Sequence, residues 1–84
     1  MDIEFTEAAH VDYLWWKRRD SAKFERIKKL CLAILQNPFK GIGKPEPLKF
    51  DLKGCWSRRI DRTHRLVYQM QHKKIIVISC RYHY

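Results

Sequence analysis

The chain has 84 residues and a mass of 10.3 kDa, which allow one domain with one small core. Eighteen Lys and Arg against nine Asp and Glu give a formal charge of +9, and a hydrophobic share of 45% argues against a disordered chain. The apolar runs, such as residues 75–78, are far shorter than the roughly 20 residues that cross a bilayer. The acidic start at Asp2 and Glu4 argues against an export signal. Three cysteines without C-x-x-C spacing exclude a closed disulfide framework and favour a reduced, cytoplasmic protein.

The positive charge is concentrated after residue 25. Residues 1–25 hold six acids and four bases, a net of −2, and residues 26–84 hold three acids and fourteen bases, a net of +11; together they give +9. A basic surface of this size is typical of proteins that bind a polyanion, because phosphate contacts release counterions. The alternative is that the charge only keeps the protein soluble. The aromatic residues that lie between the basic residues favour polyanion binding over a role in solubility alone.

Apolar periodicity predicts a strand and a helical hairpin in the first half of the chain. Residues 2–6 alternate polar and apolar side chains, as in a half-buried strand. Thr6 and Asp20 are each suited to cap the start of a helix. Asn37 before Pro38 ends the second helix, because proline disfavours helical geometry in the preceding residue. Helical spacing predicts which side chains face the core. In the first helix they are Val11, Leu14 and Trp15, with Trp16 on a flank. In the second helix they are Phe24, Ile27, Leu30, Cys31, Ile34 and Leu35.

The second half of the chain is predicted to form strands. Residues 38–47 contain all three prolines and two of the three glycines, so no regular element is expected there. From residue 48 the apolar period becomes 2, which predicts strands over residues 48–52, 55–60, 65–70 and 74–82. Short turns between them favour antiparallel pairing. The predicted fold is a single α+β domain over residues 1–84, with order β-α-α-β-β-β-β and a helical hairpin on one face of a mostly antiparallel, twisted sheet.

Side-chain alternation assigns the two faces of this sheet. The face expected to contact the helices carries Leu66, Tyr68, Met70, Ile76, Ile78 and Cys80. The opposite face then carries Arg65, Ser79, Arg81 and His83. If the strands on either side of residues 60–64 pair residues whose numbers sum to 124, Arg59 lies opposite Arg65. Like charges across a ladder repel unless an anion lies between them, so this uncovered face is the candidate phosphate-binding surface.

Two side chains are suited to acid–base chemistry. Glu46 lies between Pro45 and Pro47, which fix its backbone; the alternative is an ordinary solvated loop acid. His83 can exchange a proton near neutral pH; the alternative is a terminal histidine without a task. Together with several arginines they match RNA cleavage by the RNA's own 2′-hydroxyl. The carboxylate takes the 2′-OH proton, the imidazole protonates the 5′-oxygen, and arginine stabilises the phosphorane without a metal.

Other chemistries fit the sequence less well. The cysteines and histidines lack the spacing of zinc ligands, and no metal or cofactor is expected. Residues 41–44 contain two glycines and a lysine but lack the full pattern of a phosphate-binding loop. Cys80 and His83 would point to opposite faces of a strand, which argues against a Cys–His nucleophile pair. Cys31 is expected to pack in the core.

Four motifs resemble those of the YoeB (Txe) toxins of the RelE superfamily, and the resemblance covers the whole length of the chain. They are Lys44-Pro-Glu-Pro-Leu-Lys49, Trp56-Ser-Arg-Arg-Ile60, His64-Arg-Leu-Val-Tyr68 and Cys80-Arg-Tyr-His-Tyr84. The resemblance implies a RelE-like, microbial-RNase-like fold and the toxin of a bacterial type II toxin–antitoxin pair. Such a toxin is an mRNA endoribonuclease (mRNA interferase) that cuts in the ribosomal A site and inhibits translation. Its products would be a 2′,3′-cyclic phosphate or 3′-phosphate and a 5′-hydroxyl.

The same resemblance implies roles for individual residues and partners. Glu46 aligns with the general base, His83 with the general acid and Arg65 with the group that stabilises the transition state. Lys49 and Arg59 match phosphate-contacting positions, and Tyr84 matches a tyrosine at the active site. Lys44 and Arg81, from the basic surface, are further candidates for phosphate contact. The implied partners are an acidic antitoxin of the YefM/Axe kind, the ribosome and mRNA, without a membrane; a homodimer is left open. The alternatives are a ribosome-independent RNase and a non-catalytic RNA- or ribosome-binding module.

Overall fold

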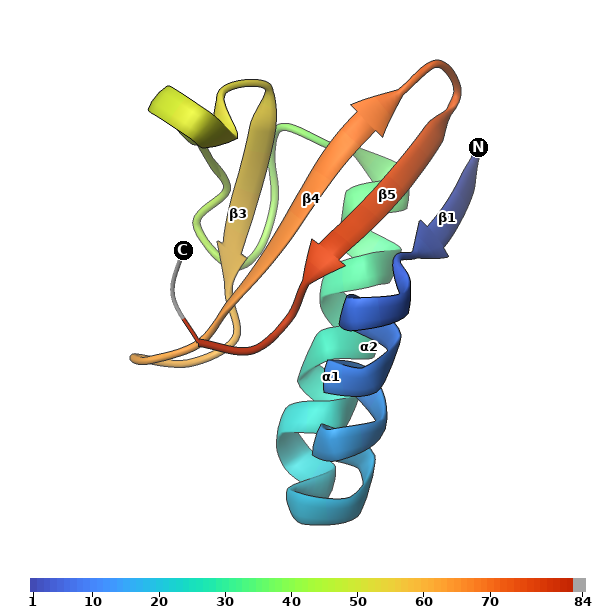
Figure 1. The fold of residues 1–84 in the computed structure, drawn as a ribbon, viewed down its shortest axis with the longest axis vertical. Helices are drawn as coiled ribbons and strands as arrows, with labels where there is room; N and C mark the ends of the chain where they lie inside the picture. Colours follow the sequence, from blue (N-terminus) through green and yellow to red (C-terminus); the bar gives the residue numbers. More distant parts are fainter. Residues whose placement is uncertain (83–84) are drawn as a thin grey trace.

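A five-stranded mixed sheet and a helical hairpin form the two layers of the computed structural model, which describes residues 1–82 (Figure 1). The elements in chain order are β1 (Asp2–Phe5), α1 (Glu7–Arg19), α2 (Ser21–Gln36), β2 (Glu46–Pro47), the 3-10 turn η1 (Phe50–Leu52), β3 (Cys55–Arg59), β4 (Arg65–Gln71) and β5 (Lys74–Ser79). The spatial order is β1-β5-β4-β3-β2. Only β1, which runs parallel to β5, departs from antiparallel pairing within these residues. The predicted α+β architecture is confirmed.

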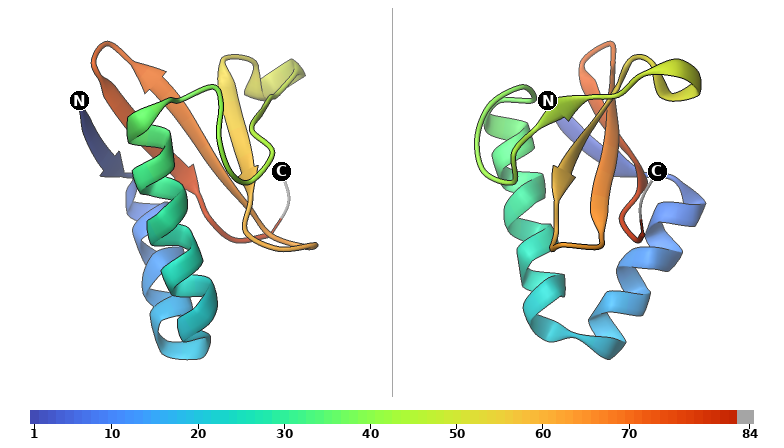
Figure 2. Two further views of the ribbon diagram at one scale, coloured as in Figure 1. Left: turned by 180° about the vertical axis from the view of Figure 1, so that it is seen from behind. Right: turned by 90° about the vertical axis from the view of Figure 1, so that its left-hand side faces the viewer.

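Both predicted helix starts are confirmed by side-chain caps. Thr6 Oγ1 accepts from the N–H of Ala9 at 3.1 Å, and Asp20 Oδ1 accepts from the N–H of Lys23 at 3.2 Å. Each such cap contributes about 1 kcal/mol. The hairpin that they start covers one face of the sheet when viewed from behind (Figure 2). Neither α1 nor α2, the helices of residues 1–82, is long and apolar enough to span a membrane.

The main core lies between the hairpin and the sheet. The apolar stripe predicted for α2 is confirmed, with Ile27, Leu30 and Ile34 completely buried. The face predicted for α1 is wrong in part: Val11 and Leu14 are exposed, whereas Trp15 packs against the core and Trp16 is buried. A stripe at positions i, i+4 and i+7 faces the core, and it consists of Ala9, Tyr13 and Trp16.

The strand predicted over residues 48–52 is wrong. The extended segment stops at Pro47, and Phe50 takes a left-handed backbone with φ 56° and a side chain that is 91% exposed. The apolar alternation that suggested a strand comes from Leu48 and Leu52. Both pack onto the sheet face opposite the helices, in a second cluster with Cys55, Val67 and Ile78. This cluster covers part of the face that was predicted to be bare.

A β-bulge reverses the predicted faces along most of β5. Tyr68 pairs with Val77, but the preceding Val67 pairs with Ser79, so Ile78 is an extra residue in β5. Ile75 and Val77 therefore face the helices in place of Ile76 and Ile78, whereas Cys80 lies in the main core as predicted. One inserted residue shifts the register of the strand by one, so every side chain that precedes the insertion lies on the other face of the sheet. The strand also ends at Ser79, before the predicted end at residue 82.

Candidate active site

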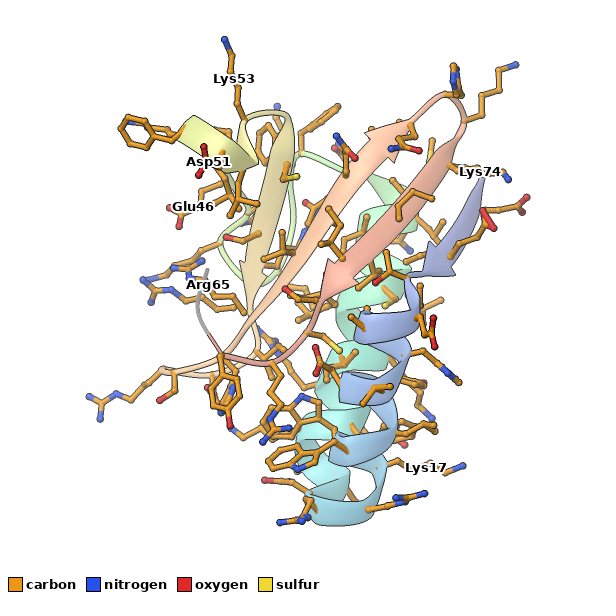
Figure 3. All side chains as sticks on the ribbon, viewed as in Figure 1. Lys17, Glu46, Asp51, Lys53, Arg65 and Lys74 are labelled. Carbon is orange, nitrogen blue, oxygen red and sulfur yellow. The ribbon has the colours of Figure 1, made fainter. Side chains whose placement is uncertain are left out.

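Glu46 and Arg65 form an ion pair on the sheet face opposite the helices. Glu46 lies on β2 in register with Ser57 of β3, and Arg65 is the first residue of β4. Arg65 Nη1 lies 3.2 Å from Glu46 Oε1, with the arginine side chain 15% and the carboxylate side chain 48% exposed. Both side chains project from the β2–β3 side of the molecule, away from the hairpin (Figure 3). The predicted base and the predicted phosphate-stabilising group are thus in contact.

Ser57 is a second partner of the Arg65 guanidinium. This serine is completely buried, and its hydroxyl accepts a hydrogen bond from Arg65 Nη1 at 3.0 Å. Glu46 and Ser57 therefore fix the same nitrogen. Sequence reasoning did not single out Ser57. The signal was available, because Ser57 lies two residues before Arg59 and so shares its face of β3.

Arg59 adds a second positive charge beside the pair. It lies directly opposite Arg65 in the β3–β4 ladder, as the predicted register required. Its main chain is held on both sides: its N–H donates to the carbonyl of Gly43 at 2.7 Å, and Arg26 Nη2 donates to its carbonyl at 3.1 Å. The residue itself remains exposed. The predicted juxtaposition of two arginines is confirmed, and an anion between them would relieve their repulsion.

A buried arginine fixes the loop that leads to Glu46. Arg58 is completely buried, and its Nε donates to Tyr68 Oη at 3.1 Å. Its terminal nitrogens donate to three loop carbonyls, those of Asn37, Lys40 and Ile42. A buried guanidinium is tolerated only when its N–H groups are satisfied, so this loop and this side chain depend on each other. Sequence reasoning missed Arg58, although its alternation with Trp56 places it on the helix-facing side of β3.

Gly43 lets this loop approach the core. It has φ +85°, and a Cβ there would lie 2.8 Å from Leu30 Cδ2 and 3.1 Å from Arg58 Cβ. No larger residue fits without a shift of the Leu30 side chain or of the buried arginine. The glycine therefore sets the path of the chain immediately before Lys44 and the Glu46 strand.

The surface beside Glu46 is open, basic and partly aromatic. Residues 46–50 line a shallow depression of about 360 Å³. Lys44 and Lys49 are exposed on either side of the carboxylate in the chain. The exposed ring of Phe50 was not singled out from the sequence, where it was read as a strand residue. An exposed ring beside cations is the arrangement on which nucleic-acid bases stack.

Arg81 lies elsewhere than predicted. Its guanidinium carbon is 3.8 Å from the centre of the Trp15 ring of α1 and 4.7 Å from that of Tyr82. The predicted position on the open sheet face is wrong, because β5 ends at Ser79 and strand alternation no longer applies beyond it. His83 and Tyr84, the predicted acid and the predicted terminal tyrosine, lie outside the described residues.

The three thiols are poor nucleophiles. Burial raises the pKa of Cys31 to about 11 and also raises that of Cys55. Burial and the charge of Asp12 raise the pKa of Cys80 well above its ordinary value. A thiol that stays protonated at neutral pH packs as a small apolar group. Over residues 1–82, no group of three or more His, Cys, Asp or Glu side chains could hold a metal ion.

Comparison with known proteins identifies the family. The sequence model of the family of YoeB-like toxins of bacterial type II toxin–antitoxin systems matches residues 5–84. This chain belongs to the YoeB family of toxins. The toxin YoeB of Synechocystis is 52% identical over 84 residues, covering 100% of this chain and 98% of the relative. The toxin YoeB of Escherichia coli K12 is 43% identical over 84 residues and the whole of both chains. This chain is therefore the toxin of a type II toxin–antitoxin system.

Solved structures of YoeB toxins share the fold. A YoeB/ParE toxin from Agrobacterium tumefaciens superimposes with a TM-score of 0.97 at 43% identity, covering 100% of both chains. A YoeB–YefM complex from Staphylococcus aureus gives a TM-score of 0.90 at 41% identity over 98% of this chain and 95% of that one. A YoeB dimer from the same species gives 0.92 at 41% identity, over 100% of this chain and 98% of that one. The fold expected from the resemblance is confirmed.

Proposed function

We propose that this YoeB-family toxin is a ribosome-dependent endoribonuclease that cleaves mRNA in the ribosomal A site and so inhibits translation. The observation that carries the proposal is the contact between Glu46 and Arg65 on a basic sheet face. A carboxylate and a guanidinium 3.2 Å apart place a proton acceptor beside a phosphate-binding cation. Arginine suits this role because its planar N–H groups match phosphate oxygens.

The reaction is a metal-free transesterification. The 2′-oxygen attacks the adjacent phosphorus as Glu46 takes its proton, and Arg65 stabilises the added negative charge on the phosphorane. The bond from phosphorus to the 5′-oxygen then breaks, and His83 protonates the leaving oxygen. The products are a 2′,3′-cyclic phosphate, which water can open to a 3′-phosphate, and a 5′-hydroxyl. General acid–base steps of this kind each contribute about 10²- to 10⁴-fold.

The surrounding cations and rings bind the mRNA in this scheme. Lys44, Lys49 and Arg59 are all exposed around the ion pair and contact backbone phosphates. The exposed ring of Phe50 offers a stacking surface for an unpaired base, and Tyr84 offers a second. Arg81, which stacks on Trp15 of α1 and does not face the ion pair, would contact a more distant phosphate.

The proposed partners follow the charge of the chain. A net +11 over residues 26–84 (fourteen bases and three acids) favours an acidic antitoxin of the YefM kind, which folds over the basic face. The YoeB–YefM complex of the Staphylococcus aureus relative supports this partner, and the YoeB dimer of that species supports a homodimer. The toxin acts in the cytoplasm, where it meets ribosomes and mRNA.

Mapping of product ends tests the proposed function. Purified toxin is incubated with mRNA alone and with mRNA on programmed ribosomes. We expect cleavage on ribosomes only, with cyclic or 3′-phosphate and 5′-hydroxyl ends. Equal cleavage of free mRNA would establish a ribosome-independent RNase instead. Intact mRNA on ribosomes that nevertheless bind the toxin would establish a non-catalytic binding module.

A further inference from the structure

The segment after β5 is held at two points before it reaches the end of the described chain. The first is Cys80, whose carbonyl accepts from Trp16 Nε1 at 2.7 Å and whose N–H donates to Asp12 Oδ2 at 3.2 Å. The second is Tyr82, whose carbonyl accepts from the N–H of Arg65 at 3.0 Å. The chain thus turns beneath β4 and arrives beside the residue that pairs with Glu46 (Figure 1).

The imidazole of His64 completes the second attachment. Its Nδ1 lies 2.7 Å from the main-chain nitrogen of Tyr82. A backbone N–H can only donate, so Nδ1 has to carry the lone pair and the ring hydrogen has to sit on Nε2. An imidazolium, which carries hydrogens on both nitrogens, cannot make this contact. The bond also holds Tyr82 at φ +65°, a left-handed backbone that tyrosine rarely adopts.

His64 is itself held rigidly. Its carbonyl accepts from the N–H groups of Ile60 and Asp61, and its N–H donates to Asp61 Oδ1 at 2.7 Å. Its ring packs edge-on against Trp16, with centroids 4.8 Å apart, and against the ring of Tyr82 at 5.4 Å. Nδ1 therefore points at one fixed place, and the mechanism above assigns His64 no task.

We propose that His64 is a positioning residue for cleavage: through Nδ1 it fixes the backbone at Tyr82, the residue that directly precedes the proposed acid His83 in the sequence. The inference rests on the proposed function. Consecutive Cα atoms lie about 3.8 Å apart, so a change in backbone direction at any residue shifts the position open to the next one by ångströms. A misplacement of about 1 Å can cost roughly 10²-fold in rate.

Two isosteric amides separate this role from simple packing. In His64→Asn the amide oxygen takes the place of Nδ1, whereas in His64→Gln it takes the place of Nε2, so only Asn keeps an acceptor for Tyr82. Both variants lose the ring and its edge-on packing with Trp16. His10→Asn and His10→Gln, at an exposed site on α1, are the matched controls.

The variants are compared by amide hydrogen exchange of Tyr82, melting temperature and the kcat and KM of mRNA cleavage on ribosomes. We expect His64→Gln to speed exchange at Tyr82 about tenfold and to lower kcat at least about tenfold with KM unchanged, and His64→Asn to restore both to within about threefold. Equal kcat values for the two amides at matched melting temperatures would overturn the proposal, as would an unchanged Tyr82 exchange rate in His64→Gln. If the unsubstituted toxin does not cleave, the proposed function fails, and the exchange rates alone decide whether His64 holds Tyr82.

Discussion

Glu46 Oε1 and Arg65 Nη1 lie 3.2 Å apart, although 19 positions separate the two residues in the chain. The carboxylate side chain is 48% exposed, so the pair resembles a surface ion pair, which contributes about 0–1 kcal/mol to stability. The contact therefore matters more for the placement of two chemical groups than for holding the fold together. It brings a base and a cation to one edge of the sheet, where β2 meets β3.

Replacement of Glu46 separates catalysis from stability. Glu46→Gln removes the proposed base, and we expect single-turnover cleavage on ribosomes to fall about 10²- to 10⁴-fold. The melting temperature should shift by less than about 5 °C, because the pair contributes little to folding. Glu4→Gln is the matched control, since Glu4 is 51% exposed and pairs with Lys74 at 3.1 Å. Equal cleavage by the two variants would remove Glu46 from the mechanism.

Ser57 is expected to orient Arg65. Ser57→Ala removes the hydroxyl that accepts from Arg65 Nη1, and we expect cleavage to fall about tenfold while stability changes by about 1 kcal/mol. Ser79→Ala, at a half-buried site on β5, is the control. Single-turnover rates and chemical denaturation measure the two effects. A Ser57→Ala toxin that is less stable but cuts at the unsubstituted rate would leave the serine with a structural role only.

Replacement of the two adjacent arginines on β3 should affect different properties, stability for Arg58 and RNA binding for Arg59. Arg58→Ala leaves three loop carbonyls and the Tyr68 hydroxyl without their donor, and we expect a loss of about 3–5 kcal/mol in the free energy of unfolding. Arg59→Ala, at the exposed neighbouring position, should lower the free energy of unfolding by less than about 1 kcal/mol. It should instead weaken RNA binding and make that binding less dependent on salt concentration. Denaturant titration and RNA binding at two salt concentrations check both expectations. Similar stability losses in the two variants would contradict the role given to Arg58.

Burial of Cys31 predicts a loss of stability in alkali. Its pKa rises from 9.0 to about 11 on folding. Between these values the unfolded thiol has lost a proton that the folded thiol keeps, so the free energy of unfolding falls as pH rises. We expect the melting temperature to decrease from pH 8 to 10.5, and to decrease less in Cys31→Ala than in the unsubstituted protein. Parallel pH curves for the two proteins would show that this thiol does not contribute.

Local signals in the sequence predicted local structure well. The caps at Thr6 and Asp20 depend on contacts three residues away, and both are confirmed. The pairing of Arg59 with Arg65 followed from the length of one turn. Features that depend on contacts between distant parts of the chain were not predicted from the sequence. The rotation of α1 depends on Trp16 reaching the carbonyl of Cys80, 64 residues later in the chain.

The candidate site was likewise predictable only where local sequence signals mark its residues. The prolines beside Glu46 and its motif singled out the residue, but a two-residue β2 carries no periodic signal, so its contact with Arg65 was not predicted. The bulge at Ile78 likewise leaves no mark in an unbroken aliphatic run. Phe50 shows the limit of alternation, because its backbone is left-handed at a position where the alternating pattern predicts a strand.

The most direct test of the proposed mechanism changes the RNA and leaves the toxin unaltered. An mRNA with a single 2′-deoxy nucleotide on the 5′ side of the scissile phosphate is placed in the A site, and its cleavage is compared with that of the all-ribose message. Because the 2′-oxygen is the nucleophile in the proposed mechanism, the deoxy message should bind the complex normally and remain intact. Cleavage of the deoxy message at the same phosphate and at a similar rate would contradict attack by the 2′-hydroxyl, and with it the role of Glu46 as the base.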